Sequence, residues 1–238
     1  MKKPILIIFI DALPYDRGLN IATALNSSAY NMTVPGVGYS INVKAELFAG
    51  LRPDDVGYFC EWNYDPLSKV GMIVKVVTPI LEFFGKRSWF LNRVFHRLLK
   101  MILNENVYAI PYSILPLLKC SGLTAYERNF SRPTVLSEGG FDRVLYSEEG
   151  VDDEKIFNKA SEKLRTEKNE RLFIATAQLD GVMHHYGMEC EEYESQIELI
   201  EEKVVPLVNN FLDIHGDDAK YYIFSDHGMA IVKEAVKF

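Results

Sequence analysis

Three short apolar segments of the sequence are each followed closely by an aspartate. The segments are residues Ile5–Ile10, 172–177 and 221–224, and the aspartates are Asp11, Asp180 and Asp226. Runs of this length that are rich in β-branched and aromatic residues are typical of strands buried in a parallel sheet. Open α/β sheets carry their sites just beyond the carboxyl ends of strands. The pattern therefore predicts that carboxylates from three strands meet at one edge of a sheet.

The size and charge of the chain limit the number of domains and the class of partner. The chain has 238 residues, of which 48% are hydrophobic and 25% charged, and this suits one sizeable core with a smaller insertion. The formal net charge is −7. Nucleic-acid-binding proteins usually present a basic face, so no nucleic-acid partner is expected.

The cysteines and the N-terminus favour a cytoplasmic location. Cys60, Cys120 and Cys190 are scattered and form no CxxC pair, which suits reduced thiols rather than a disulfide framework. The apolar run Ile5–Ile10 is short, ends at Asp11 and has no cleavage pattern after it, so a buried strand is favoured over a signal peptide.

Amphipathic patterns predict helices over residues 153–164 and 192–212. The acidic run Glu189 to Glu202 falls mostly outside the apolar face of the second pattern. We therefore interpret it as a solvated helix face rather than a metal site.

Residues 67–132 differ in character from the rest, since basic and aromatic side chains alternate there and Pro and Gly interrupt the pattern. We predict an inserted helical cap over these residues, and a catalytic core formed by residues 1–66 and 133–238. The basic and aromatic residues of the cap suggest contact with an anionic, partly apolar substrate, and they are compatible with peripheral contact with an anionic membrane or lipid head group. A cap that only packs on the core is the alternative.

Five Asp and His side chains follow the predicted strands: Asp11, Asp180, His184, Asp226 and His227. Asp226 and His227 leave the sheet edge on one tight turn, and Asp180 and His184 are one helical turn apart. Mixed Asp and His ligands suit zinc, with manganese as the alternative. Two divalent ions about 4 Å apart can activate a nucleophile and stabilise a leaving oxygen in phosphoryl transfer.

Further motifs accompany these residues. They are Ser40 placed ten residues before Gly50-Leu51-Arg52-Pro53, Tyr64-Asp65-Pro66, Asp180 with His184, Tyr186 and Gly187, and Ser225-Asp226-His227-Gly228-Met229. Together with Asp11 after the first strand, they resemble the alkaline phosphatase superfamily, most closely its type I phosphodiesterase/nucleotide pyrophosphatase branch. The resemblance spans nearly the whole chain outside the cap.

The resemblance implies a three-layer α/β/α core with a mainly parallel sheet. It implies that Ser40 is the nucleophile and that Asp11, Ser40, Asp226 and His227 hold one metal ion. Asp180 and His184 would hold the second. The expected reaction is hydrolysis of a small-molecule or lipid-linked phosphate ester, with phosphodiesters or nucleotide pyrophosphates favoured, through a covalent Ser40 intermediate.

The sequence also departs from the family. The second metal site lacks a further histidine after His227, so this site is expected to be incomplete, and the chain is expected to be a shortened form of a longer protein. The phosphate-facing Asn of the diesterases falls on Glu61, and Asn63 is the candidate substitute. A phosphotransferase, a mutase or a sulfatase on the same scaffold, and a non-catalytic metal-binding module, remain as alternatives.

Overall fold

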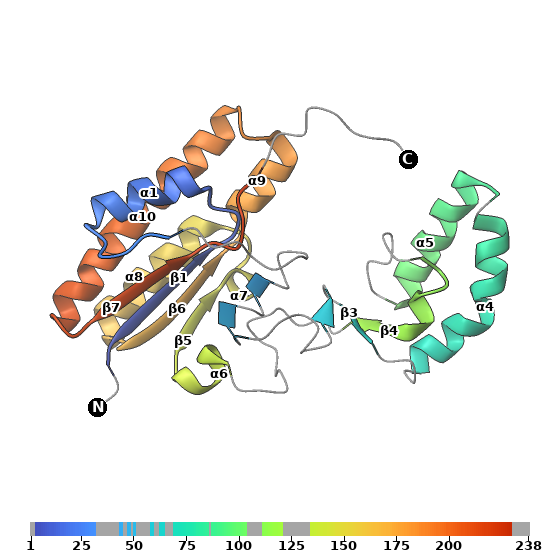
Figure 1. The fold of residues 1–238 in the computed structure, drawn as a ribbon, viewed down its shortest axis with the longest axis horizontal. Helices are drawn as coiled ribbons and strands as arrows, with labels where there is room; N and C mark the ends of the chain where they lie inside the picture. Colours follow the sequence, from blue (N-terminus) through green and yellow to red (C-terminus); the bar gives the residue numbers. More distant parts are fainter. Residues whose placement is uncertain are drawn as a thin grey trace. The chain divides into compact units, whose positions relative to one another are not determined.

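The computed structural model describes residues 3–31, 43–44, 47–48, 50, 58–59, 62–64, 69–85, 87–103, 111–120 and 134–229 (Figure 1). The chain divides into two compact units, one of residues 1–35 and 132–238 and the other of residues 36–131. The candidate nucleophile Ser40 lies outside the described residues.

The first unit is built on a four-stranded parallel sheet. Its strands are β1 (Ile5–Ile10), β5 (Asp142–Leu145), β6 (Arg171–Thr176) and β7 (Lys220–Phe224), in the order β5-β6-β1-β7. Phe9 of β1 is in register with Ala175 of β6 on one side and Phe224 of β7 on the other. The three strands predicted from the sequence are thus confirmed, and their carboxyl ends lie at the same edge.

Four helices cover one face of this sheet (Figure 1): α1 (Tyr15–Ala24), α8 (Asp153–Glu167), α9 (Gln178–Tyr186) and α10 (Glu191–His215). Alternate β1 residues Leu6, Ile8 and Ile10 lie in one buried cluster with side chains of these helices. Successive strand residues point to opposite faces, so Ile7 and Phe9 face the other side. Mixed α/β architecture with a parallel sheet is therefore confirmed.

A shorter helix, α6 (Val135–Gly139), lies by the opposite face, close to β5. Arg143 of β5 is out of phase with Val144, which belongs to the helix-covered cluster. The Arg143 guanidinium donates to the carbonyl of Leu136 in α6 over 3.1 Å. A further short helix, α7 (Tyr146–Glu149), directly follows β5.

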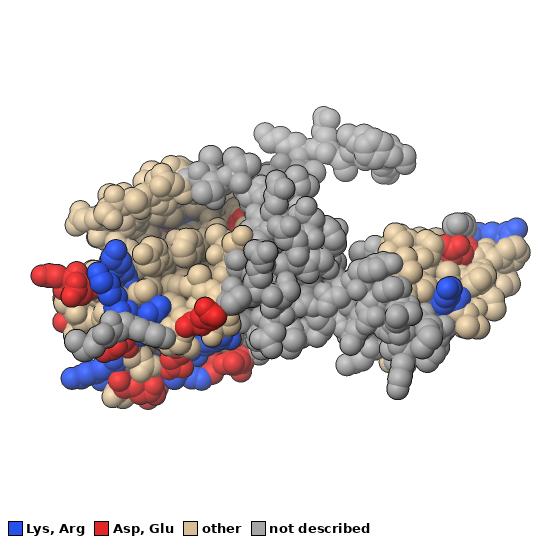
Figure 2. Space-filling model, turned by 60° about the horizontal axis from the view of Figure 1, so that its bottom comes forward, with Lys and Arg blue, Asp and Glu red and all other residues tan. Residues whose placement is uncertain are grey.

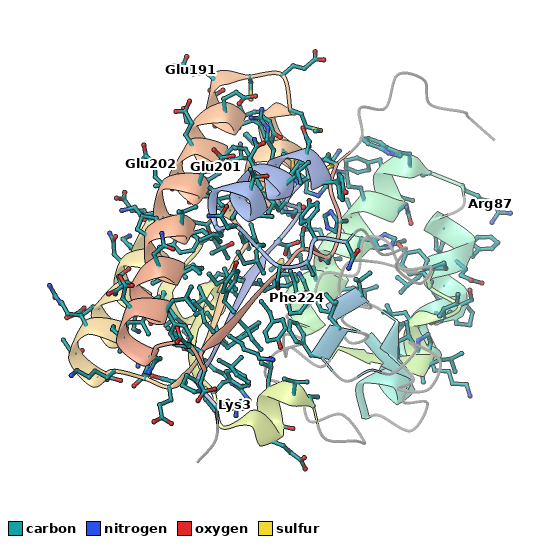
Figure 3. The ribbon with its side chains drawn as sticks, turned by 60° about the vertical axis from the view of Figure 1, so that its left-hand side comes forward. Lys3, Arg87, Glu191, Glu201, Glu202 and Phe224 are labelled. Atoms are coloured by element: carbon teal, nitrogen blue, oxygen red, sulfur yellow. The ribbon has the colours of Figure 1, made fainter. Side chains whose placement is uncertain are left out.

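The helices α8 and α10 confirm the two amphipathic patterns of the sequence. In α10, Tyr193, Ile197 and Ile200 are buried. The acidic residues Glu191 and Glu202 lie on the outer side of the helix, where they are exposed to solvent (Figure 3). The solvated acidic face predicted for this segment is thus confirmed.

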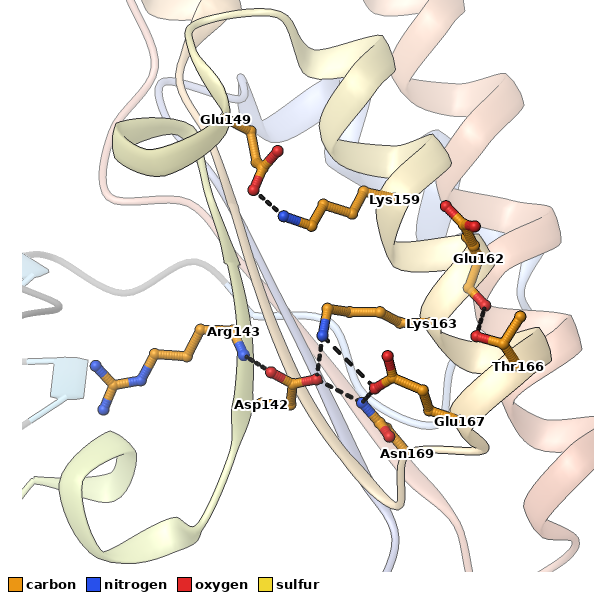
Figure 4. A network of polar contacts seen from close by, with 9 residues as sticks. All are labelled: Asp142, Arg143, Glu149, Lys159, Glu162, Lys163, Thr166, Glu167 and Asn169. Atoms are coloured by element: carbon orange, nitrogen blue, oxygen red, sulfur yellow. Dashed lines mark hydrogen bonds and ion pairs between the residues drawn. The ribbon is translucent and has the colours of Figure 1, made fainter.

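Polar contacts fasten the edge strand β5 to α8 and the loop after it (Figure 4). The Asp142 carboxylate accepts from Lys163 Nζ at 2.6 Å and from the Asn169 side-chain amide. Lys159 pairs with Glu149 in α7. The Asp142 carboxylate raises the pKa of Lys163 through its hydrogen bond, so the ion pair persists over the neutral range.

In the part of the second unit that the structure describes, α4 and α5 accompany a small antiparallel sheet. The helices are α4 (Lys69–Gly85) and α5 (Trp89–Leu103), and the strands are β2 (Tyr58–Phe59), β3 (Trp62–Tyr64) and β4 (Leu118–Cys120), with the 3₁₀ helix η1 (Leu115–Leu117) before β4. Pro79 lies inside α4, so this helix continues through one of the residues that interrupt the sequence pattern. No described helix is both apolar enough and long enough to pass through a lipid bilayer.

The boundary of the insertion also differs from the predicted one. Residue Trp62 of β3 is in register with Cys120 of β4. This pairing groups residues 58–64 with the inserted segment, whereas the sequence placed the start of the insertion at residue 67. Strands of two or three residues leave no periodic signal, so this sheet was not predicted.

Candidate metal centre

Asp11 stands where β1 ends. Its backbone N–H donates to the carbonyl of Thr176 at the end of β6, over 3.3 Å, so it stays tied to the sheet edge. The next residue, Ala12, has a positive φ of 63° and turns the chain away from the strand direction. Only 6% of Asp11 is exposed. A carboxylate is therefore held inside the protein at the carboxyl end of a central strand.

Asp226 occupies the equivalent place after β7, and 4% of it is exposed. Its Oδ1 accepts from the backbone N–H of Ala12 at 3.3 Å and from that of His227 at 3.1 Å. These two bonds join the turn after β1 to the turn after β7. They also orient the carboxylate, so that Oδ2 lies 3.7 Å from Nε2 of His227.

The His227 ring is oriented by its own turn. Its Nδ1 lies 2.9 Å from the carbonyl of Gly228, which can only accept, so Nδ1 carries the hydrogen. In the neutral ring, Nε2 then presents its lone pair. It lies 3.6 Å from Asp11 Oδ1 and 3.7 Å from Asp226 Oδ2, too far for hydrogen bonds. The hydrogen bond on the far nitrogen is the usual arrangement of a metal-binding histidine.

These three residues fit a divalent cation. One ligand atom from each of Asp11, Asp226 and His227 lies within 4.8 Å of the others, and the described part of the chain contains one such group. In a tetrahedral zinc site with bonds of about 2.0–2.2 Å, ligand atoms are separated by about 3.4 Å. The His227 distances come close to that. Two buried carboxylates side by side also repel each other, and a cation would offset the repulsion.

Asp180 and His184 are brought together on α9 but not with the other three. His184 Nε2 lies 3.4 Å from Asp180 Oδ1, one helical turn away. The His184 side chain is 68% exposed. The pair supplies two ligand groups, whereas zinc sites take three or four from the protein. Neighbouring His185 is exposed and packs edge-on against Tyr186.

A buried carboxylate that the sequence did not single out positions α9. Asp153, at the start of α8, accepts from the backbone N–H groups of Ala177 and Gln178, each at 3.2 Å, and from Gln196 Nε2 at 2.9 Å. Asp153 is fully buried. Burial raises the pKa of its carboxyl from 3.8 to about 6, against the opposing effect of these hydrogen bonds. In the sequence it is an ordinary acidic residue of a helix first turn.

The remaining predicted residue belongs to the second unit. Asn63 lies in β3, in register with Tyr58 and Lys119. In the same unit, His96 stacks on Tyr112 with ring centroids 4.5 Å apart. Its Nδ1 also contacts the Tyr112 hydroxyl at 2.8 Å.

No family model matches the sequence, and no curated protein matches it either.

Proposed function

We propose that this protein is a metal-dependent hydrolase of phosphate esters with an alkaline-phosphatase-like core. The observation that carries the proposal is the convergence of Asp11 Oδ1, Asp226 Oδ2 and His227 Nε2 at the carboxyl ends of two adjacent parallel strands. Open α/β sheets place ligands at this edge. Two carboxylates and one imidazole form a donor set that suits zinc and also accepts manganese.

In this proposal Asp11, Asp226 and His227 hold one divalent cation, and Ser40 is the nucleophile that the motif resemblance implies. Asp180 and His184 contribute a second, weaker half-site. A divalent cation bound by Asp11, Asp226 and His227 would supply positive charge for phosphoryl oxygens and lower the pKa of a coordinated hydroxyl. The two buried carboxylates, Asp11 and Asp226, would bind the cation through their negative charge. The hydrogen bond from His227 Nδ1 to the Gly228 carbonyl fixes the direction in which Nε2 points.

The proposed reaction proceeds in two displacements. Ser40 Oγ gives up its proton and attacks phosphorus, a bond from Oγ to phosphorus forms, and the bond from phosphorus to the leaving oxygen breaks as that oxygen takes up a proton. Water then attacks the phosphorus bound to the serine, losing one proton; the bond from phosphorus to Ser40 Oγ breaks, and the serine hydroxyl regains its proton. The net change is one ester bond hydrolysed. A diester or nucleotide pyrophosphate is the favoured substrate, because the motif around Asp180 and His184 resembles that branch.

Metal analysis combined with turnover tests the proposal. The chain should bind zinc or manganese, hydrolyse bis(nitrophenyl) phosphate, lose activity with a chelator and regain it when metal returns. Asp11→Asn should lose metal and activity, whereas Asp218→Asn, an exposed site in the turn before β7, is the matched control. Full activity in the metal-free protein would refute the assignment.

The same assay separates the alternative functions. Transfer of the phosphoryl group to an added alcohol in preference to water would identify a phosphotransferase. Turnover of nitrophenyl sulfate but not of phosphate esters would identify a sulfatase. Metal bound with no turnover of either ester would identify a non-catalytic binding module.

A further inference from the structure

The helical hairpin of α4 and α5 exposes an unusual number of large apolar side chains. We call this the hairpin surface. Its members are Val76, Val77, Ile80, Phe83, Phe84, Trp89, Phe90, Leu98 and Met101. The two most exposed aromatic residues, Trp89 at 72% and Phe90 at 66%, begin α5 directly after the turn. A contiguous exposed apolar surface of this kind usually marks an interaction site.

The hairpin does not need this surface for its own packing. Its inward side buries Leu81, Leu99 and His96. The Tyr112 hydroxyl donates to the side-chain oxygen of Asn92 at 2.8 Å, on the same inward side. The exposed apolar residues lie on the outward side of each helix, at the three- and four-residue spacing of one face. They are therefore available to a partner.

Positive charge accompanies the aromatic side chains. Residues 69–103 contain seven Lys and Arg and one Glu, a net charge of +6 in a chain whose formal net charge is −7. The Arg87 guanidinium lies 3.7 Å from the ring centroid of Phe83, and that of Arg93 lies 5.3 Å from a ring centroid of Trp89. Arg87 lies in the turn between α4 and α5 (Figure 3). In Figure 2 the right-hand part of the surface is largely uncharged, with two separate groups of basic atoms and one acidic group.

In α5 the basic and apolar side chains share one exposed side of the helix. Phe90 and Leu98 lie eight residues apart on one line of the helix. Trp89, Arg93, Arg97 and Met101 lie on the neighbouring line, at steps of four residues. Helices that combine exposed apolar and basic side chains in this way lie in the interface of anionic membranes, where aromatic rings settle at head-group depth.

We propose that the α4–α5 hairpin binds an anionic lipid surface, with the aromatic side chains of its turn in the head-group region and its arginines on the lipid phosphates. A second copy of the hairpin is a poor partner, because it would place two sets of positive charges against each other. A bilayer carrying anionic lipid complements both the charge and the apolar area. The inference is independent of the proposed catalytic function.

Tryptophan fluorescence provides a direct readout, because the chain has two tryptophans, Trp62 and Trp89. In a Trp62→Phe variant, Trp89 reports alone. Mixing with phosphatidylcholine vesicles containing about a third phosphatidylserine should shift its emission to shorter wavelength. Pure phosphatidylcholine should give little shift, and raising NaCl toward 0.5 M should reverse the binding, since surface potentials are screened by salt.

Variants in the native sequence then locate the contact, with vesicle flotation as the measure. Arg93→Glu with Arg97→Glu should lower the partition coefficient at least about tenfold, because each basic residue near an anionic surface contributes appreciably. Trp89→Ser should weaken binding as well. Arg165→Glu and Val151→Ser, which are exposed sites in the first unit, serve as the matched charge and apolar controls. Circular dichroism and the thermal midpoint check that each variant is folded.

Several results would overturn the inference. These are absence of binding to anionic vesicles, equal binding to both vesicle types, and hairpin variants that bind like the controls. Light scattering that shows concentration-dependent self-association abolished by Trp89→Ser would also overturn it, since the surface would then join copies of the chain.

Discussion

Replacing Asp153 by Asn should stabilise the protein at neutral pH, although it changes a buried residue with three hydrogen-bond donors around it. In the wild-type chain the carboxyl has a pKa of about 6, raised from 3.8 by burial. At pH 7.5 the folded protein therefore carries a buried charge. Asn can keep the contacts without that charge: its side-chain oxygen can accept from Ala177 and Gln178, and the Gln196 amide can turn to accept from its nitrogen.

The raised pKa sets both the size and the sign of the effect. A shift of about two units corresponds to about 3 kcal/mol at most. Because the folded-state pKa of Asp153 lies above the unfolded one, the folded state binds more protons between pH 4 and 6. Its contribution to stability is complete below about pH 4, is lost as the pH rises to about 6, and stays level above that. The neutral amide makes weaker hydrogen bonds than the carboxylate, so the net gain expected for Asp153→Asn at pH 7.5 is about 1–2 kcal/mol.

Urea unfolding curves from pH 3.5 to pH 8 measure this. Other carboxylates titrate in the same range, so the informative quantity is the difference between variant and wild type at each pH. The advantage of Asp153→Asn should shrink as the pH falls from 6 to 4. Asp152→Asn is a matched control of opposite sign, because the hydrogen bond and ion pair with Lys155 lower the pKa of the partly exposed Asp152 carboxyl. That variant should be destabilised at neutral pH and approach wild type on acidification.

Asp153→Ala tests what the fold loses when the hydrogen-bond acceptor at this position is removed. It leaves the N–H groups of Ala177 and Gln178 and the Gln196 amide without their acceptor. Each buried donor without a partner costs about 1–3 kcal/mol, so this variant should be strongly destabilised at every pH. If Asp153→Asn is destabilised as much as Asp153→Ala at pH 7.5, the ionised carboxylate stabilises the fold and the reasoning from burial is wrong.

Three further outcomes follow from the candidate site. Ser40→Ala should lower the rate of diester hydrolysis by at least about 10³, because a covalent path cannot proceed without the nucleophile; near-normal turnover would show that water attacks directly. Metal analysis after dialysis should find one tightly held ion per chain, and Asp180→Asn should leave that ion in place; two retained ions would contradict this. Added zinc should raise the thermal midpoint of the wild type, and Asp11→Asn should lose most of that rise, since a cation that binds the folded state stabilises it.

The sequence predicted the parts of the fold whose own patterns are strong. The uninterrupted apolar run of β1 and the amphipathic repeat of α10 each identify one element without help from distant residues. The sheet strand β5 was missed because its four residues begin with Asp142 and Arg143, whose charges are balanced by contacts from elsewhere in the fold. The small sheet of the second unit was missed for a related reason, because its strands are two or three residues long.

The candidate site was predictable to the extent that topology alone determines it. Asp11 and Asp226 each follow a parallel strand, and parallel strands that are neighbours must deliver these residues to the same edge. The role of Asp153 was not predictable, because it depends on the N-terminus of α9 and on Gln196 of α10, which lie far away in sequence. The separation of Asp180 and His184 from the other three residues likewise depends on where α9 begins after β6.

Asp11 and Asp226 both contact the candidate cation position, but they make different hydrogen bonds. This difference decides which substitution is the better test of metal binding. Asp226 uses Oδ1 to hold the turns after β1 and β7 through the N–H groups of Ala12 and His227, while Oδ2 faces the candidate cation position. Its replacement would disturb the backbone that aims His227, as well as removing a ligand. Asp11 has its backbone N–H fixed on Thr176, a contact that does not involve its side chain. Asp11→Asn keeps this main-chain bond and removes the negative charge at the end of β1, so a loss of metal in a variant that keeps its circular dichroism spectrum can be attributed to that charge.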